Sequence, residues 1–87
     1  MKKFKRGTVV VFEPNNFNQD YWKKLSEKKR KDYYGALGYG SKKKKFFVFL
    51  TVVKNAPEHC VLVSLDDQKI ETMRHISDFR EVTEEEF

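Results

Sequence analysis

The longest apolar run of the chain, Phe46–Val53, is interrupted only by Thr51. Aromatic and β-branched residues favour strands, and a nearly unbroken apolar run is typical of a strand that is buried on both faces. The four residues before this run, 42–45, are all lysines, and ammonium groups are not buried without counter-charges. The pattern therefore predicts a central strand that begins at a dense positive charge.

Shorter segments with the composition or alternation of strands lie on either side of this run. Turn-forming residues separate them, at Pro14, at residues 55–58 and at residues 66–68. We therefore predict further strands at residues 8–12, 59–65, 69–74 and 80–83.

Residues 17–37, between the first strand and the central one, have a helical pattern instead. Trp22 and Leu25 are three residues apart, so they fall on one face of a helix and could anchor this insertion on the sheet. Ser26 is a good N-cap for a second helix. We therefore predict two short helices, at residues 19–26 and 27–34, rather than one long helix.

The second predicted helix is charged on nearly all sides, so it cannot lie in a core. Gly35 follows it directly and is predicted to end it in the left-handed conformation that glycine adopts without strain. Residues 36–41 then form a loop that leads to the four lysines.

The pattern of the last part of the chain predicts a short helical turn followed by a closing strand. Residues 75–79 suit a short 3₁₀ connection that turns Ile76 and Phe79 inward, before the closing strand. Residues 84–87 are predicted to be a frayed acidic tail, and residues 1–6 a basic leader.

This order of elements resembles the small SH3-like barrels, including the Tudor and KOW types. The resemblance covers residues 1–87 as one domain and depends on the element order, the turn at Asp66 and Asp67, and the segment 73–82. It implies a mainly β fold, a five-stranded SH3-like barrel with a helical insertion after the first strand.

In such barrels the long first loop often lines the ligand surface. The resemblance would extend this role to Trp22, Tyr33 and Tyr34 of the insertion, although a helical version could instead cap the barrel. We expect Trp22 to anchor the insertion rather than to bind a ligand. Residues 33–39 and 59–63 also resemble segments of small bacterial and phage proteins, which implies no activity.

Composition places the chain among folded, soluble domains. It has 87 residues, of which 39% are hydrophobic and 15% aromatic, enough for one small core. Cys60 is the single cysteine, so no intramolecular disulfide can form. The longest apolar run is too short to cross a bilayer, and the N-terminal one is too short for an export signal. We expect a cytoplasmic protein without membrane contact.

The net charge of +5 conceals a strong asymmetry. Residues 1–45 hold fourteen Lys/Arg and four Asp/Glu, which gives +10, whereas residues 46–87 hold four and nine, which gives −5. Such a division predicts a polyanionic partner for the basic half, or a homodimer in which basic and acidic surfaces meet.

Basic and aromatic residues cluster in the insertion and the loop after it. Cations neutralise phosphates and release counterions, and exposed rings stack on unpaired bases. Lysine is far commoner than arginine there, which favours backbone contact over base reading and predicts binding with little sequence specificity. The predicted nucleic-acid-binding residues are Lys23, Lys24, Lys28, Arg30, Lys31, Tyr33, Tyr34, Tyr39, Lys42, Lys43, Lys44 and Lys45.

Two other interpretations stay open for these features. The basic residues could be a solvated surface that only keeps the protein soluble, with the tyrosines packed on the sheet. The chain could also be a regulatory or phage-encoded protein-interaction module, because its acidic second half and apolar Phe87 would not attract nucleic acid.

Other candidate chemistry is weak. His59 and Cys60 are adjacent in a strand and point to opposite faces, so they cannot share a metal ion with His75, and Cys60 suits a core position. The acidic pair Asp66 and Asp67 is explained by a turn, and the glycine loop lacks Walker spacing. We therefore predict a protein that is not an enzyme and that holds neither a metal nor a cofactor.

Overall fold

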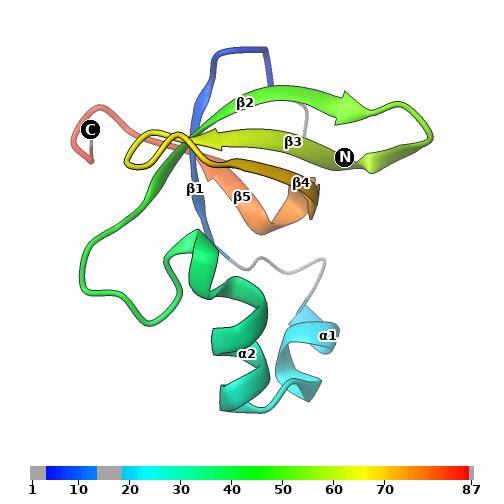
Figure 1. The fold of residues 1–87 in the computed structure, drawn as a ribbon, viewed down its shortest axis with the longest axis vertical. Helices are drawn as coiled ribbons and strands as arrows, with labels where there is room; N and C mark the ends of the chain where they lie inside the picture. The colour runs from blue at the N-terminus through cyan, green and yellow to red at the C-terminus, as the bar shows by residue number, and fades with distance from the viewer. Residues whose placement is uncertain (1–3, 14–18, 87) are drawn as a thin grey trace.

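A computed structural model of the chain describes residues 4–13 and 19–86, with Gln19 and Tyr21 described by their backbone only. Within these residues the fold is mainly β, as predicted, with five antiparallel strands and two short α-helices (Figure 1). The elements are β1 (Val9–Phe12), α1 (Gln19–Lys24), α2 (Glu27–Tyr34), the 3₁₀ helix η2 (Gly35–Leu37), β2 (Phe46–Val53), β3 (Ala56–Ser64), β4 (Ile70–His75), the 3₁₀ helix η3 (Ile76–Asp78) and β5 (Phe79–Glu81).

The five strands form one sheet in the order β4-β3-β2-β1-β5. Each neighbouring pair is antiparallel, and β1 pairs with β2 on one side and with β5 on the other. The predicted central strand is indeed the middle one of the sheet. β4 and β5 are the two edges among the described strands, so the ladder of hydrogen bonds is open.

Only one face of β2 is fully buried, so the predicted burial of both faces is wrong. Phe47 and Phe49 are 0% and 4% exposed, whereas Phe46 and Val48 between them are only half-buried. Successive side chains of a strand point to opposite faces, and the core lies against one face alone. The apolar run therefore reflects strand propensity more than two-sided burial.

The turn between β2 and β3 is shorter than predicted. Ala56 already pairs with Val53, which leaves only Lys54 and Asn55 between the strands. Pro57 is accommodated near the start of β3, where prolines are tolerated. A turn at residues 55–58 is therefore wrong, and the returning strand starts at Ala56 rather than at His59.

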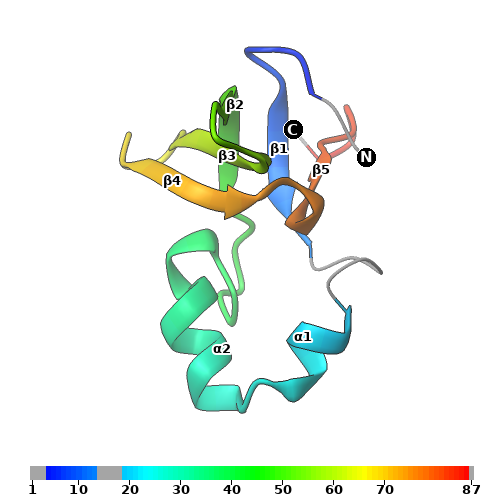
Figure 2. The same cartoon turned by 90° about the vertical axis from the view of Figure 1, so that its right-hand side faces the viewer.

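The predicted pair of helices is confirmed, and the helices cover one end of the core. Figures 1 and 2 show α1 and α2 lying together beyond the end of the sheet. Ser26 caps α2 by accepting a hydrogen bond from the Lys29 N–H at 3.3 Å. The Trp22 ring lies 6.0 Å from that of Phe12 and 5.2 Å from that of Tyr34, so Trp22 anchors the insertion as predicted.

Gly35 does not end α2 in a left-handed conformation, so this prediction is wrong. Its φ and ψ are −58° and −39°, and the chain continues into η2. Gly38 is the left-handed residue, with φ +99°, and its N–H donates to the Gly35 carbonyl. The extra turn brings Leu37 into the core, where it is 2% exposed.

The last part of the chain has the predicted 3₁₀ connection, but its acidic tail is more ordered than predicted. The 3₁₀ connection is present, and Ile76 and Phe79 are 1% and 0% exposed, as expected. The acidic tail is not frayed at Glu86, which accepts hydrogen bonds from Arg80. Residues 1–3 of the predicted leader and the terminal Phe87 lie outside the described residues.

Candidate nucleic-acid interface

Most of the predicted lysines are exposed and carry uncompensated charge. They lie at the end of α1, along α2 and at the start of the lysine run after Gly40. Among the described residues, no carboxylate lies within ion-pair distance of these ammonium groups. Lys29, which is not one of the predicted residues, is exposed on α2 in the same way. The whole set, called the open lysines below, consists of Lys23, Lys24, Lys28, Lys29, Lys31, Lys42 and Lys43.

The last two lysines of the run are tied to carboxylates of the same chain. Lys44 Nζ lies 2.6 Å from Glu86 Oε2, and Lys45 Nζ lies 3.4 Å from Asp67 Oδ2. The backbone N–H of Lys69 lowers the pKa of Asp67, and the ammonium of Lys45 adds to this effect. The run therefore contains two open lysines, Lys42 and Lys43, and two lysines, Lys44 and Lys45, that form ion pairs within the chain.

Arg30 serves the fold rather than an exposed surface. Its Nε and Nη2 atoms donate to the Trp22 carbonyl oxygen at 3.1 and 2.8 Å. Its guanidinium also lies over the indole ring of Trp22, 4.6 Å from the ring centroid. Arg30 therefore connects α2 to α1. Its positive charge can still attract a ligand, but Nε and Nη2 already donate to Trp22.

The three tyrosines predicted to stack on bases have different environments. Tyr34 is 8% exposed, and its ring stacks on Phe12 at 5.0 Å, so it belongs to the core. Tyr39 is half-buried, and its hydroxyl donates to the carboxylate of Glu27 at 2.9 to 3.0 Å. Tyr33 is 54% exposed and is the one of the three that presents its ring to solvent.

The charge asymmetry of the sequence becomes a division between two parts of the fold. Residues 20–43, which contain both helices, hold eight Lys/Arg and three Asp/Glu, a net of +5. Residues 46–86, which contain β2 to β5, hold four and nine, a net of −5. Residues 20–43 are thus the positive part of the fold and residues 46–86 the negative part, whereas the segment 4–13, which contains β1 of the same sheet, has a net charge of +1.

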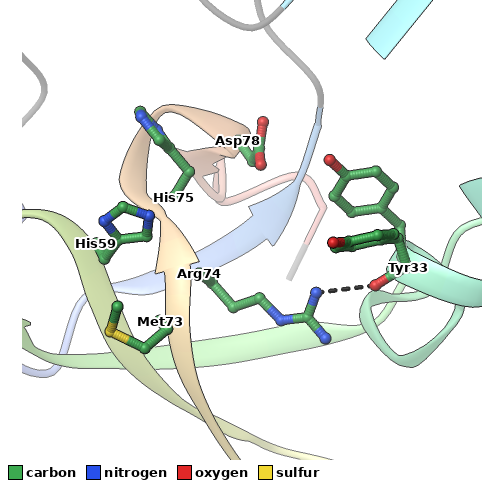
Figure 3. A pocket seen from close by; sticks show the side chains of 7 residues that line it. Tyr33, His59, Met73, Arg74, His75 and Asp78 are labelled. Carbon is green, nitrogen blue, oxygen red and sulfur yellow. Dashed lines mark hydrogen bonds between the residues drawn. The ribbon is translucent and has the colours of Figure 1, made fainter. Parts of the chain in front are cut away.

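A pocket of about 260 Å³ lies between the C-terminal end of α2 and the edge strand β4 (Figure 3). Arg74 closes one side of it, because its Nη1 donates to the Tyr33 carbonyl oxygen at 2.8 Å. Its Nε and Nη2 bind Glu71 Oε1 at 2.9 and 2.7 Å. The other lining residues include His59, Met73, His75 and Asp78.

Sequence reasoning missed this pocket, because its residues come from three separated segments, which are the end of α2, the strand β3, and β4 with η3. One local sign of the pocket is a feature of the backbone that the sequence does not reveal. Met73 has a φ of +57° and interrupts the pairing of β4 with β3. A positive φ is strained for a residue with a long side chain and is often found at functional sites. Met73 is 54% exposed as a result.

The histidines and the cysteine do not form a metal cluster. The His59 and His75 rings lie 5.4 Å apart, and the described residues contain no group of three or more His, Cys, Asp or Glu side chains placed to hold an ion. Cys60 is 0% exposed on the core face, as predicted. Burial, with a smaller effect of the Asp78 charge, raises the pKa of Cys60 to about 12, so its thiol is protonated at neutral pH.

No protein-family model, curated protein or solved structure matches this chain. In the part of the chain that the structure describes, no helix is long and apolar enough to span a membrane.

Proposed function

We propose that this protein is a non-enzymatic nucleic-acid-binding domain that contacts the phosphate backbone with little sequence specificity. The observation that carries this proposal is the set of seven open lysines, which are exposed and have no carboxylate partner among the described residues. Five of the seven lie on the two helices, beyond the end of the sheet, and this concentration of positive charge supports a polyanion as the partner.

The mechanism is phosphate neutralisation and counterion release. Lysine offers a mobile point charge on a long side chain, which suits phosphate oxygens of any sequence. Each neutralised phosphate adds to the dependence of affinity on salt, by about 0.7 in the log–log slope for single strands and about 0.9 for duplexes. Arg30 contributes charge, but its donors are engaged by Trp22.

We also propose that the sheet is an SH3-like barrel, in which the helical insertion takes the place of the long first loop. The strand order and the 3₁₀ helix between β4 and β5 support this assignment. The buried, unpaired thiol of Cys60 suits a reducing compartment, and we place the protein in the cytoplasm.

Fluorescence anisotropy with labelled single-stranded and duplex oligonucleotides at rising salt tests the proposal. The wild-type protein should bind both at low salt, with a steep slope. The triple variant Lys28→Ala, Lys29→Ala, Lys31→Ala should lower the single-strand slope by up to about 2, at 0.7 for each lost contact. The absence of binding at low salt, or binding without a salt slope, would reject the proposal.

A matched control removes lysines from the negative part of the fold. Lys54 and Lys69 are both exposed and lie at turns of the sheet. The double variant Lys54→Ala, Lys69→Ala changes net charge by two without touching the insertion. Its slope should match that of the wild type, which separates a local interface from a general effect of net charge.

A protein-interaction module is the second candidate, and the edge strand β4 favours it. Ile70 and Met73 on this strand are 62% and 54% exposed, and β4 pairs with β3 alone among the described strands. The occupant could be another protein or a second copy of this chain. A pull-down from nuclease-treated extract separates the candidates, because a protein partner survives nuclease and a nucleic-acid bridge does not.

A further inference from the structure

The pocket beside Tyr33 is held in shape before any ligand arrives. Arg74 connects β4 to the end of α2 through the Tyr33 carbonyl, so the Tyr33 side chain takes no part in this connection. Asp78, on η3, also lines the pocket and is 6% exposed. Figure 3 shows Tyr33 on one side and His59 and Met73 on the other, with Arg74 between them.

The size and lining of the pocket suit one flat ring system. Its volume of about 260 Å³ is just below the range of roughly 300–1,000 Å³ that is typical of drug-sized ligands. Tyr33 and His59 supply rings, and Met73 supplies a polarisable thioether that adapts to aromatic surfaces. Aromatic rings such as these are the groups on which unpaired bases stack.

The charges at the pocket favour a neutral ligand with both donors and acceptors. Arg74 is ion-paired with Glu71, with 2.7 Å between Nη2 and Oε1, so the guanidinium offers a phosphate no uncompensated charge in the pocket itself. A guanidinium has five N–H groups, and the described hydrogen bonds of Arg74 use three of them. Two donors therefore remain for a ligand, and the base edge can use them.

The surroundings of the pocket point to the same ligand. Lys29 precedes Tyr33 by one helical turn, so it lies on the same face of α2. Lys28 and Lys31, also open lysines, lie on the same helix. A strand whose phosphates follow α2 would bring a base to the pocket at the end of that helix.

We propose that this pocket takes a single unpaired nucleobase from a strand whose phosphates contact the open lysines of α2. This inference rests on the proposed function and adds to it a preference for single-stranded nucleic acid. A duplex keeps its bases paired and would contact the lysines alone.

The test compares three labelled probes of equal length, which are an oligothymidylate, an abasic strand with the same phosphates, and a duplex. The wild-type protein should bind oligothymidylate about five-fold or more tightly than the abasic strand, as expected for one stacked base. Tyr33→Ala should reduce this ratio to about one while it leaves the affinity for the abasic strand unchanged.

Two further variants keep the test independent of folding defects. Met73→Gly removes another wall of the pocket and suits the positive φ of that position, so it should also abolish the base preference. Ile70→Ala removes an exposed side chain from the same strand outside the pocket and should retain the preference. Circular dichroism checks that each variant is folded.

The outcomes separate this inference from the function on which it rests. Salt-dependent binding with equal affinity for oligothymidylate and the abasic strand overturns the base pocket and leaves phosphate binding intact. A base preference that survives both Tyr33→Ala and Met73→Gly places the base elsewhere and also overturns it. No binding of any probe overturns both proposals. If oligothymidylate and the abasic strand bind equally well, and the Tyr33→Ala variant loses a protein partner that the wild type binds, the pocket is a site for a peptide instead.

Discussion

The guanidinium of Arg30 lies over the indole of Trp22, 4.6 Å from the ring centroid, and donates two hydrogen bonds to the carbonyl of the same residue. α1 has only six residues, and so short a helix is not stable by itself in water. The Arg30 contacts join it to α2, which in turn packs on the core through Tyr34. An arginine in the most basic part of the chain is therefore used to build the insertion.

Replacing Arg30 should cost stability more than affinity. Arg30→Lys keeps the positive charge but loses the forked hydrogen bonds and most of the stacking, at a cost of about 1–3 kcal/mol in the free energy of unfolding. The salt slope for nucleic acid should stay the same. Urea unfolding, followed by Trp22 fluorescence, measures the free energy of unfolding. Fluorescence anisotropy at rising salt measures the slope. Lys29→Ala, on the exposed face, should change stability by less than about 0.5 kcal/mol.

The lysine run should divide into two functional halves. Lys42→Ala with Lys43→Ala removes open lysines, so the single-strand slope should fall by about 1.4, at 0.7 for each, with little change in stability. Lys44→Ala with Lys45→Ala removes ion-pair partners of Glu86 and Asp67, so it should lower stability and leave the slope nearly unchanged. Equal slope changes in the two double variants would contradict this division.

The two glycines at the start and the end of η2, Gly35 and Gly38, should respond differently to alanine. Gly38 has a φ of +99°, and an added Cβ would lie 3.1 Å from Lys45 Cβ, so Gly38→Ala should cost about 1–2 kcal/mol. Gly35 has a helical φ of −58° and nothing within 4 Å of an added Cβ, so Gly35→Ala should be neutral or stabilising by up to about 1 kcal/mol. Urea midpoints at an unchanged m-value give the change in the free energy of unfolding for each variant. A Gly38→Ala variant that is more stable than Gly35→Ala would be inconsistent with this backbone.

The features that were predicted correctly from the sequence are those with a local cause. Ser26 caps α2 because a hydroxyl at that position reaches an N–H three residues away, whatever the rest of the chain does. The strand Phe46–Val53 and the burial of Ile76 and Phe79 follow from composition and spacing in the same way.

The features that were missed depend on contacts between distant segments. Lys44 and Lys45 look as free as Lys42 and Lys43 until the fold brings Glu86 and Asp67 to them. The left-handed residue after α2 is Gly38 rather than Gly35, because the 3₁₀ helix η2 continues the chain from α2 and buries Leu37. The pocket could not be predicted for the same reason, as its sides are joined by residues 41 apart in sequence.

Glu86 should make the protein sensitive to acid. Arg80 donates to both of its carboxylate oxygens, at 2.6 and 2.8 Å, and Lys44 adds a third charged donor at 2.6 Å. These contacts, Arg80 first, hold the pKa of Glu86 well below the ordinary value of about 4.3. Because the folded pKa is below the unfolded one, this contribution to stability is complete above the unfolded pKa. It is lost as pH falls through the folded pKa.

Urea unfolding at a series of pH values and low salt checks this expectation. The free energy of unfolding of the wild type should decrease as pH falls from about 5, in the direction set by the depressed pKa. Glu86→Gln should be less stable at neutral pH and should show a smaller decrease in acid, with the remainder due to groups such as Asp67. Glu85→Gln is the matched control, because Glu85 is exposed and no ion pair of the described residues involves it. Parallel curves for the wild type and Glu86→Gln would mean that the carboxylate is not bound by Arg80 and Lys44 in solution.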